Sequence, residues 1–176
     1  MAHLSRLDHE LRQLLHAQRV ASLGTLDRDG EPQVSMVPYA IETHASTLIL
    51  HVSALAAHTG NMARHPAVSV LVMQSPGTDA PVHALPRVTL QARAEPPEPD
   101  SASWRAARAA YLARFPEAAP MMALADFRLV VLQLVRARHV AGFGAARTVE
   151  AGLLAQLLAQ GDDLDGGANG DPMRPR

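Results

Sequence analysis

The residues best suited to chemistry lie between two apolar runs, the first of which ends at Ser53. His58, Thr59 and Asn61 follow it, in the first turns of an expected short helix. The start of a helix offers an anion unpaired backbone N–H groups and the positive end of the helix dipole. Hydroxyl groups and an imidazole at such a position suit a phosphate monoester. The segment therefore predicts a site for a phosphate-bearing cofactor.

Two residue types are absent from the chain, and their absence excludes several kinds of chemistry. There is no Cys, which removes thiolate catalysis, disulfides, iron–sulfur clusters and thiolate zinc sites. There is also no Lys, which removes a Schiff-base lysine and a Walker-type phosphate site. The GxGxxG, GxSxG and HExxH patterns do not occur either. The histidines show no spacing typical of a metal site, and we expect no metal centre.

The composition is that of an ordinary globular protein. The chain has 176 residues, of which 48% are hydrophobic, and a formal net charge of −1. Its arginines do not form runs and it has few aromatic residues, so we expect no nucleic-acid partner. No apolar run is long enough to span a membrane, and the N-terminus is amphipathic and carries acidic residues, unlike a signal peptide. We therefore expect no membrane association and a cytoplasmic protein.

Hydrophobic periodicity predicts a mainly β protein with flanking helices. Helices are expected where apolar residues recur every three to four positions and a capping residue precedes them, over 4–17, 101–115 and 148–160. Strands are expected where apolar and polar residues alternate or an apolar run is short, over 19–26, 33–41, 47–53, 67–73, 87–95, 127–135 and 139–143.

Most of these strands are joined by turns, which favours a six- to seven-stranded antiparallel barrel over a parallel sheet. We expect residues 1–160 to form one domain. Residues 161–176, GDDLDGGANGDPMRPR, contain too few apolar residues to fold and are expected to be a disordered tail.

Several stretches in this order resemble the pyridoxamine 5'-phosphate oxidase-like, FMN-binding split-barrel proteins, and most closely their heme-utilisation (HugZ-type) branch. The matching segments are DGEPQVSMVPYA, HVSALAAHTGNMARHPAVSVLV, PRVTLQARAE and RHVAGFGAA. The resemblance implies a split β-barrel that forms a homodimer, with FMN in a groove at the subunit interface.

The resemblance also implies which residues contact the cofactor. Backbone groups of residues 35–38 would line the isoalloxazine, residues 52 and 53 would touch it, and the phosphate would sit near the following helix. The residues at these matched positions are Ser35, Met36, Val37, Pro38, Val52, Ser53, His58, Thr59, Arg87 and Phe143. Asn61, one turn further into the expected short helix, is a further candidate contact. We therefore expect a flavin-dependent oxidoreductase of unknown substrate.

The chain departs from the family pattern at the phosphate position. His58 and Thr59 stand where the oxidase has an Arg-Lys pair, so the site lacks one or two positive charges. The arginine and histidine pattern with which the oxidase holds its vitamin substrate is also absent near residues 136–147. Pyridoxamine phosphate oxidation is therefore not expected.

Two alternatives to a flavin protein stay open. One is a heme-binding or heme-degrading protein, although residues 150–176 lack the iron-binding histidine of that branch. His139 is a candidate iron ligand, but a histidine at a strand end is more often structural. The other is a cofactor-free dimeric module, in which His58 and Thr59 are solvated, Arg87 is an edge charge and Phe143 belongs to a turn.

Overall fold

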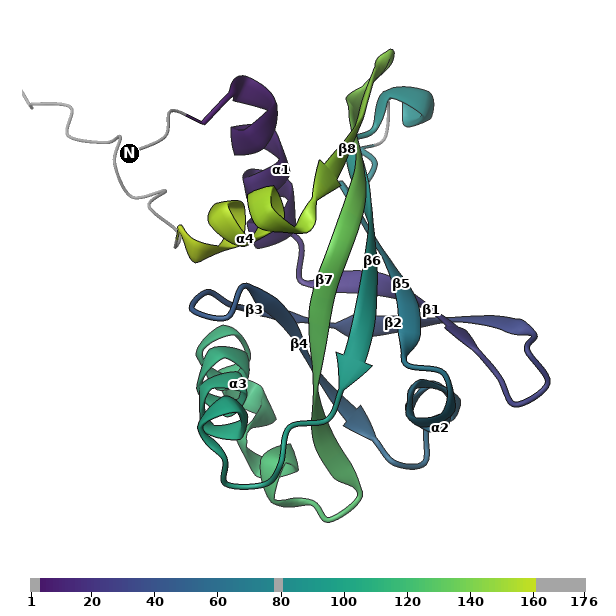
Figure 1. Cartoon of the computed structure of the whole chain (residues 1–176), viewed down its shortest axis with the longest axis vertical. Helices are drawn as coiled ribbons and strands as arrows, with labels where there is room; N and C mark the ends of the chain where they lie inside the picture. Colours follow the sequence, from purple (N-terminus) through teal and green to yellow (C-terminus); the bar gives the residue numbers. More distant parts are fainter. Residues whose placement is uncertain (1–3, 78–80, 161–176) are drawn as a thin grey trace, which may run out of the picture.

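The computed structural model describes residues 4–77 and 81–160 of the chain. Its eight strands pair only antiparallel, and helices flank the sheet (Figure 1). The elements are α1 (Arg6–Ala17), β1 (Val20–Leu26), β2 (Pro32–Pro38), β3 (Ala40–Glu42), β4 (Thr47–Ser53), α2 (Ala57–Arg64), β5 (Ala67–Met73), the 3-10 turn η1 (Val82–Ala84), β6 (Arg87–Glu95), α3 (Ala102–Arg114), the 3-10 segment η2 (Pro116–Ala123), β7 (Phe127–Gly142), β8 (Ala145–Glu150) and α4 (Ala151–Ala159). The expected antiparallel split barrel is confirmed.

One continuous chain segment supplies both end strands of the sheet. The strand order is β2-β1-β5-β6-β7-β4-β3. β8 pairs with β7, along a part of that strand that β4 does not pair with. Only Tyr39 separates β2 from β3, so the backbone passes there from one end of this order to the other. The Tyr39 side chain is fully buried, and its hydroxyl donates to the carbonyl of Leu15 at 2.6 Å. This hydrogen bond connects the bend at Tyr39 to helix α1, which contains Leu15.

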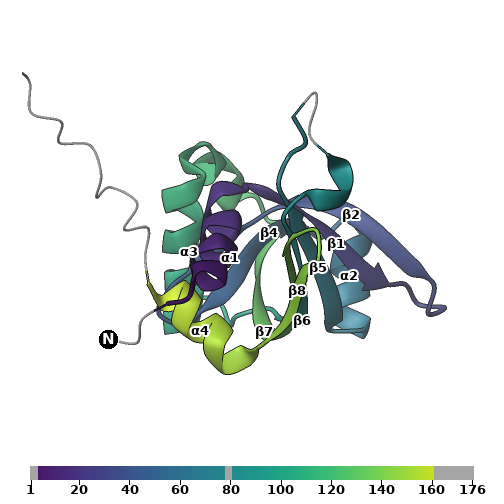
Figure 2. The same ribbon diagram turned by 90° about the horizontal axis from the view of Figure 1, so that it is seen from above.

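Two groups of buried side chains hold the helices on the barrel. The interior cluster joins the inward-facing strand residues to leucines of α1 and α4, which lie close together in Figures 1 and 2. The second cluster lies outside the barrel, where Tyr111 of α3 and Phe115, the C-cap of that helix, pack on Ile49 of β4 and Val131 of β7. Since β4 contributes to both clusters, nearly all of its residues are buried.

None of the described helices has the length and hydrophobicity to cross a membrane.

Three expected boundaries were wrong, each because tertiary pairing overrides the local pattern. The strand expected over 33–41 is divided at Tyr39 into β2 and β3. The strands expected over 127–135 and 139–143 form the single strand β7, because β6 pairs along most of its length. The helix expected from Thr148 begins at Ala151, since residues 145–150 form β8 on the edge of β7. The sequence expectation for residues 161–176 falls outside the described residues.

Candidate functional site

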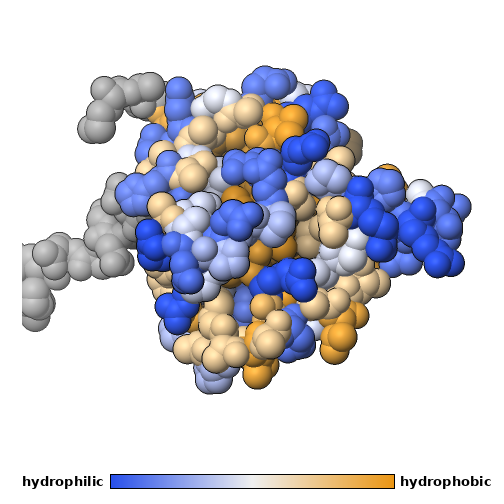
Figure 3. All heavy atoms as spheres, turned by 60° about the horizontal axis from the view of Figure 1, so that its bottom comes forward, coloured by the Kyte–Doolittle hydropathy of each residue, from blue (hydrophilic) through white to orange (hydrophobic). Residues whose placement is uncertain are grey.

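The turn between β4 and α2 gathers three of the residues expected to bind a phosphate. Ser53 ends β4, and Thr59 and Asn61 lie in α2 with their side chains directed back toward the barrel. Figure 3 brings this end of the molecule forward and shows polar and apolar residues interspersed on its surface. The structure therefore brings these residues close together, as expected.

Three polar side chains of this turn, those of Ser53, Thr59 and Asn61, already have hydrogen-bond partners within the chain. Thr59 Oγ1 donates to the Ser53 carbonyl at 2.6 Å, and the backbone N–H of Leu55 donates to Ser53 Oγ at 3.1 Å. Asn61 Nδ2 donates to Thr25 Oγ1 at 3.1 Å. Thr59 and Asn61 are also buried. These hydrogen bonds explain the residue types at the turn without a ligand.

The charges near the turn do not favour a phosphate. Ser53 Oγ donates to the carboxylate of Asp126 at 3.2 Å, which places a negative group beside the expected site. Burial lowers the pKa of His58, so its imidazole carries less positive charge at neutral pH. The assignment of Ser53, His58, Thr59 and Asn61 to a cofactor stays a prediction.

The other expected contact residues are distributed over different parts of the barrel. The side chains of Val37 and Val52 belong to the interior cluster, where only their backbone could reach a ligand. Phe143 is 91% exposed in the β7–β8 turn, at the opposite end of the molecule from α2. Ser35 and Pro38 lie partly buried on β2. Met36 and Arg87 are more informative, because both lie on the outer face of the sheet.

Strand register places residues of six strands in one row across this outer face. Cross-strand partners link Met36 to Ser22, Ser22 to Leu71, Leu71 to Thr89, Thr89 to Arg138 and Arg138 to Thr148. Directly opposed residues project from the same side of a sheet. A parallel row two residues away runs from β2 to β8 through Val34, Gly24, Ser69, Gln91, Arg136 and Glu150. Residues more than 100 positions apart in the sequence thus share one face of the sheet.

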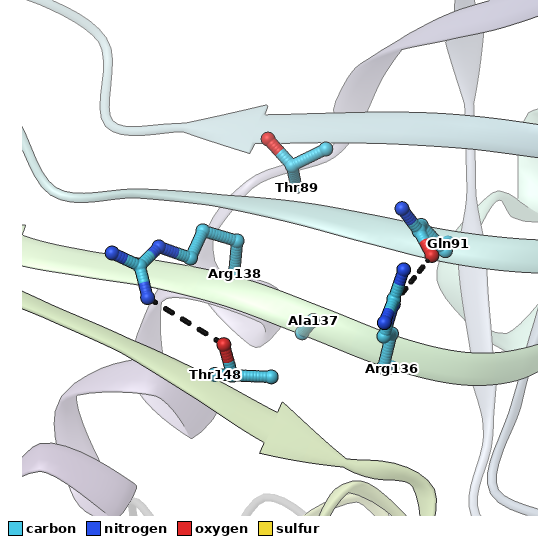
Figure 4. Close-up of a pocket in the computed structure, with 6 residues that line it drawn as sticks. All are labelled: Thr89, Gln91, Arg136, Ala137, Arg138 and Thr148. Carbon is cyan, nitrogen blue, oxygen red and sulfur yellow. Dashed lines mark hydrogen bonds between the residues drawn. The ribbon is translucent and has the colours of Figure 1, made fainter.

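The β6–β7–β8 part of this face is a shallow, cationic groove (Figure 4). Arg136 Nε donates to Gln91 Oε1 at 2.7 Å, and Arg138 donates to Thr148 Oγ1 at 3.5 Å. The groove has a volume of about 220 Å³, and its lining contains no acidic residue: Thr89, Gln91, Arg136, Ala137, Arg138 and Thr148. Both guanidinium groups keep further N–H donors. The groove can therefore receive carboxylates or phosphates; we call it the arginine groove.

The β2–β1–β5 part of the same face is apolar. Exposed fractions reach 75% for Val34 and 68% for Met36, and Val20 and Met73 are also exposed at 47% and 41%. Neighbouring strands lie about 4.8 Å apart, so this apolar area begins within about 10 Å of the arginine groove.

The sequence analysis missed the arginine groove, although the spacing of Arg136 and Arg138, two residues apart in a strand, was a usable signal.

His139, the candidate iron ligand, does not lie on this face. It points from β7 into the interior, is 1% exposed, and neither ring nitrogen has a hydrogen-bond partner in the described chain. Its cross-strand partner is Arg147, which forms an ion pair with Asp8 of α1 at 2.8 Å. Within residues 4–77 and 81–160, no three His, Asp or Glu side chains converge to hold a metal ion.

The chain matches one protein-family model, described as pyridoxamine 5'-phosphate oxidase, over residues 7–141. Among curated proteins it is 30% identical to the heme oxygenase HutZ of Vibrio cholerae over 160 residues, which is 90% of this chain and 84% of that protein.

Two solved structures are similar to the fold. The heme binding protein from Mycobacterium smegmatis superimposes with a TM-score of 0.77 at 31% identity, covering 89% of this chain. This chain spans only 62% of that protein. A structure of Vibrio cholerae HutZ, described there as a heme storage protein, gives a TM-score of 0.67 at 28% identity over 74% of this chain and 91% of the other.

Proposed function

The chain belongs to the pyridoxamine 5'-phosphate oxidase family, and from this premise we propose that it binds heme on the outer face of the β2–β1–β5–β6–β7–β8 sheet. One observation carries the proposal: the register sets an apolar area beside the arginine groove. Heme also has an apolar part beside a charged part, since its flat apolar macrocycle carries two carboxylates on one edge. The names of the similar proteins, which refer to heme oxygenase, heme binding and heme storage, support the same ligand class.

The residues on this face fit each part of heme. Arg136 and Arg138 would hold the two propionates, since successive residues on one face of a strand lie about 7 Å apart and each guanidinium can donate in pairs. Thr89 and Thr148 would add hydroxyl donors. The macrocycle would then extend across Leu71 toward the apolar strands.

The strands of this face carry no histidine that points outward, but Met36 and Met73 place thioethers on it. A thioether is a known ligand of heme iron. Bound heme would supply iron for redox and oxygen chemistry, while these side chains would only bind and orient it.

FMN, the cofactor expected from the sequence, is supported less well than heme. The side chains of Ser53 and Thr59 in the β4–α2 turn already make hydrogen bonds, and the carboxylate of Asp126 lies beside Ser53. Met36 and Arg87 do lie on the outer face, so a flavin could still use that surface. FMN is therefore the competing ligand in the experiment below, together with the flavin-dependent activity expected from it.

We also propose that the heme site is completed by a second copy of the chain. A planar ligand on one exposed face leaves its other side in water, whereas a second copy would cover both the macrocycle and the exposed apolar side chains. The homodimer expected from the family resemblance is thus a proposal with a physical reason.

Titration of the purified protein with hemin tests this function. The wild-type chain should shift the Soret band and saturate. Arg138→Gln, and likewise Arg136→Gln, should weaken hemin binding about tenfold or more, because each removes a charge-assisted contact. Arg128→Gln is the matched control: it makes the same change on the same strand, outside the arginine groove.

Parallel titration with FMN, followed by quenching of flavin fluorescence, separates the two cofactors. Saturable hemin binding that depends on Arg136 and Arg138 supports the proposal. FMN binding without hemin binding, or hemin binding that all three variants retain equally, would overturn it. Adding a reductant and oxygen to the hemin complex then distinguishes degradation, seen as loss of the Soret band, from storage.

A further inference from the structure

A second hollow lies away from the proposed heme face, between α3 and the outer surface of β3, β4 and β7. Its volume is about 360 Å³. Its lining combines apolar and polar side chains: Glu42, His44, Ala45, Thr47, Ile49, Ala102, Ser103, Ala106, Ala107, Val131 and Gln133. Figure 1 shows α3 beside β3 and β4 on the side away from α2. We call this hollow the α3 pocket.

The floor of the α3 pocket contains a polar group without a partner. Thr47 is 1% exposed, and its hydroxyl makes no hydrogen bond within the described chain. A buried hydroxyl without a partner costs free energy that a Val of the same shape would avoid, and such groups are rare in native proteins. Thr47 lies at the start of β4 on the same side as Ile49, and both residues line the hollow.

The polarity of the pocket indicates which kind of group would meet this hydroxyl. Glu42 is the only carboxylate in the lining, and the lining contains no arginine. Glu42 is 6% exposed, and its two oxygens accept the backbone N–H groups of His44 at 3.0 Å and Ala45 at 2.6 Å. These bonds hold the carboxylate in place, and each oxygen keeps a further lone pair. A positively charged donor is therefore favoured and an anion is not.

The remaining walls set the shape of a ligand. Ile49 and Val131 form an apolar base, and the alanines of α3 leave space because their side chains are short. A volume of this size holds a single ring or a short branched chain.

We propose that the α3 pocket binds small primary amines that carry a compact apolar body. The ammonium group donates to Glu42 and to Thr47 Oγ1, and the apolar body packs against Ile49, Val131 and Ala106. The site is separate from the arginine groove and shares no residue with it.

Calorimetry and chemical-shift mapping with benzylamine test the proposal on the full-length protein. Benzyl alcohol and benzoate are the comparison ligands, because they keep the ring and replace the ammonium by a neutral or a negative group. Benzylamine should bind at least tenfold more tightly than either, with shifts confined to β3, β4 and α3.

Two variants locate the site. Thr47→Val keeps the shape and removes the hydroxyl, and should weaken benzylamine binding about tenfold while the protein stays as stable or becomes more stable. Ala106→Leu should block binding by filling the pocket. Ala109→Leu is the control, since Ala109 lines only the neighbouring hollow of about 480 Å³ and not the α3 pocket.

Equal binding of the three ligands, unchanged binding in Thr47→Val and Ala106→Leu, or no binding of benzylamine would each overturn the proposal. The last of these results would mean that the Thr47 hydroxyl is satisfied by water alone.

Discussion

At the scale of single residues, the most consequential group outside the proposed sites consists of the buried Asp8 and His139 and the partly buried Arg147. Asp8 also belongs to the N-terminal capping box of α1, where it accepts from the backbone N–H and the hydroxyl of Ser5. Burial alone would raise the pKa of Asp8, but the hydrogen bonds from Ser5 and Arg147 outweigh it and lower that pKa. One carboxylate thus stabilises a helix end and ties that helix to β8.

We expect Asp8→Ala to lower the free energy of unfolding by about 1–3 kcal/mol, because it removes the cap and leaves Arg147 without its partner. Urea unfolding at pH 7 measures the change. Glu10→Ala is the control on the same helix. Its pair with Arg6, whose side chain is 80% exposed, should contribute only about 0.5 kcal/mol. Equal losses in the two variants would contradict the prediction.

The lowered pKa values of three histidines predict how the stability of the protein depends on pH. Burial, followed by the charge of Arg147, lowers the pKa of His139 from its ordinary 6.5, against opposing effects of Glu10 and Asp8. Burial also lowers the pKa of His51 and of His58. The unfolded chain then binds protons at a higher pH than the folded chain, so stability is lost as the pH falls below about 6.5.

The free energy of unfolding, measured between pH 7.5 and pH 5, should fall with the pH. In His139→Leu this free energy should depend less steeply on pH. His83→Leu, which changes an exposed histidine of η1, is the matched control and should keep the wild-type pH dependence. A pH dependence that His139→Leu leaves unchanged would show that His139 titrates alike in both states.

At the scale of elements, β7 organises both surfaces of the barrel. Its 16 residues pair with β6 on one edge and with β4 and β8 on the other. Inward-pointing residues such as His139 contribute to the interior, while Arg136 and Arg138 between them point outward. The β7–β8 hairpin therefore joins the arginine groove on its outside to the Asp8–Arg147 pair on its inside.

The β1–β2 hairpin depends on one backbone conformation. Gly30 has φ +83° in the turn, where Asp27 Oδ1 accepts the backbone N–H groups of Asp29 and Glu31, each at 2.9 Å. Residues with a side chain rarely adopt positive φ. Asp29 and Gly30 form an Asp-Gly pair, which is typical of hairpin turns.

Gly30→Ala should destabilise the protein by about 1 kcal/mol, as measured by urea unfolding. Gly152→Ala should instead stabilise the protein, because Gly152 lies in the first turn of α4, where a Cβ would meet no atom within 4 Å. A neutral Gly30→Ala variant would indicate that the turn tolerates another conformation.

At the scale of the whole molecule, the split barrel leaves one face of its sheet without a covering helix. α3 packs on β3, β4 and β7, and α1 and α4 join the interior cluster. Val34, Met36, Val20 and Met73 stay exposed on the other side. An apolar area of this kind on a folded protein marks an interaction site.

We expect the protein to be a dimer in solution and Met36→Lys to shift it toward the monomer, as measured by sedimentation, because a charge would be buried in the contact. Met121→Lys is the control: it makes the same change at an exposed methionine of η2. If Met36→Lys sediments like the wild-type chain, this face is not the dimer contact.

The sequence by itself determined the features that depend on neighbouring residues. Alternating apolar residues defined most strands, Ser101 capped the expected helix, and Asp-Gly closed the first hairpin. The order of these segments also identified the family and its barrel. The reason is that capping, turn geometry and strand alternation are set within a few residues of chain.

The tertiary structure alone decided which distant residues share a surface. Cross-strand register set Met36, Leu71 and Arg138 in one row, and Ser53 and Asn61 donate hydrogen bonds to residues of other segments. A shift of one residue in any strand would have turned its side chains to the opposite face. Pairing between segments far apart in the chain fixes that register, and therefore which side chains lie together on the outer face of the sheet.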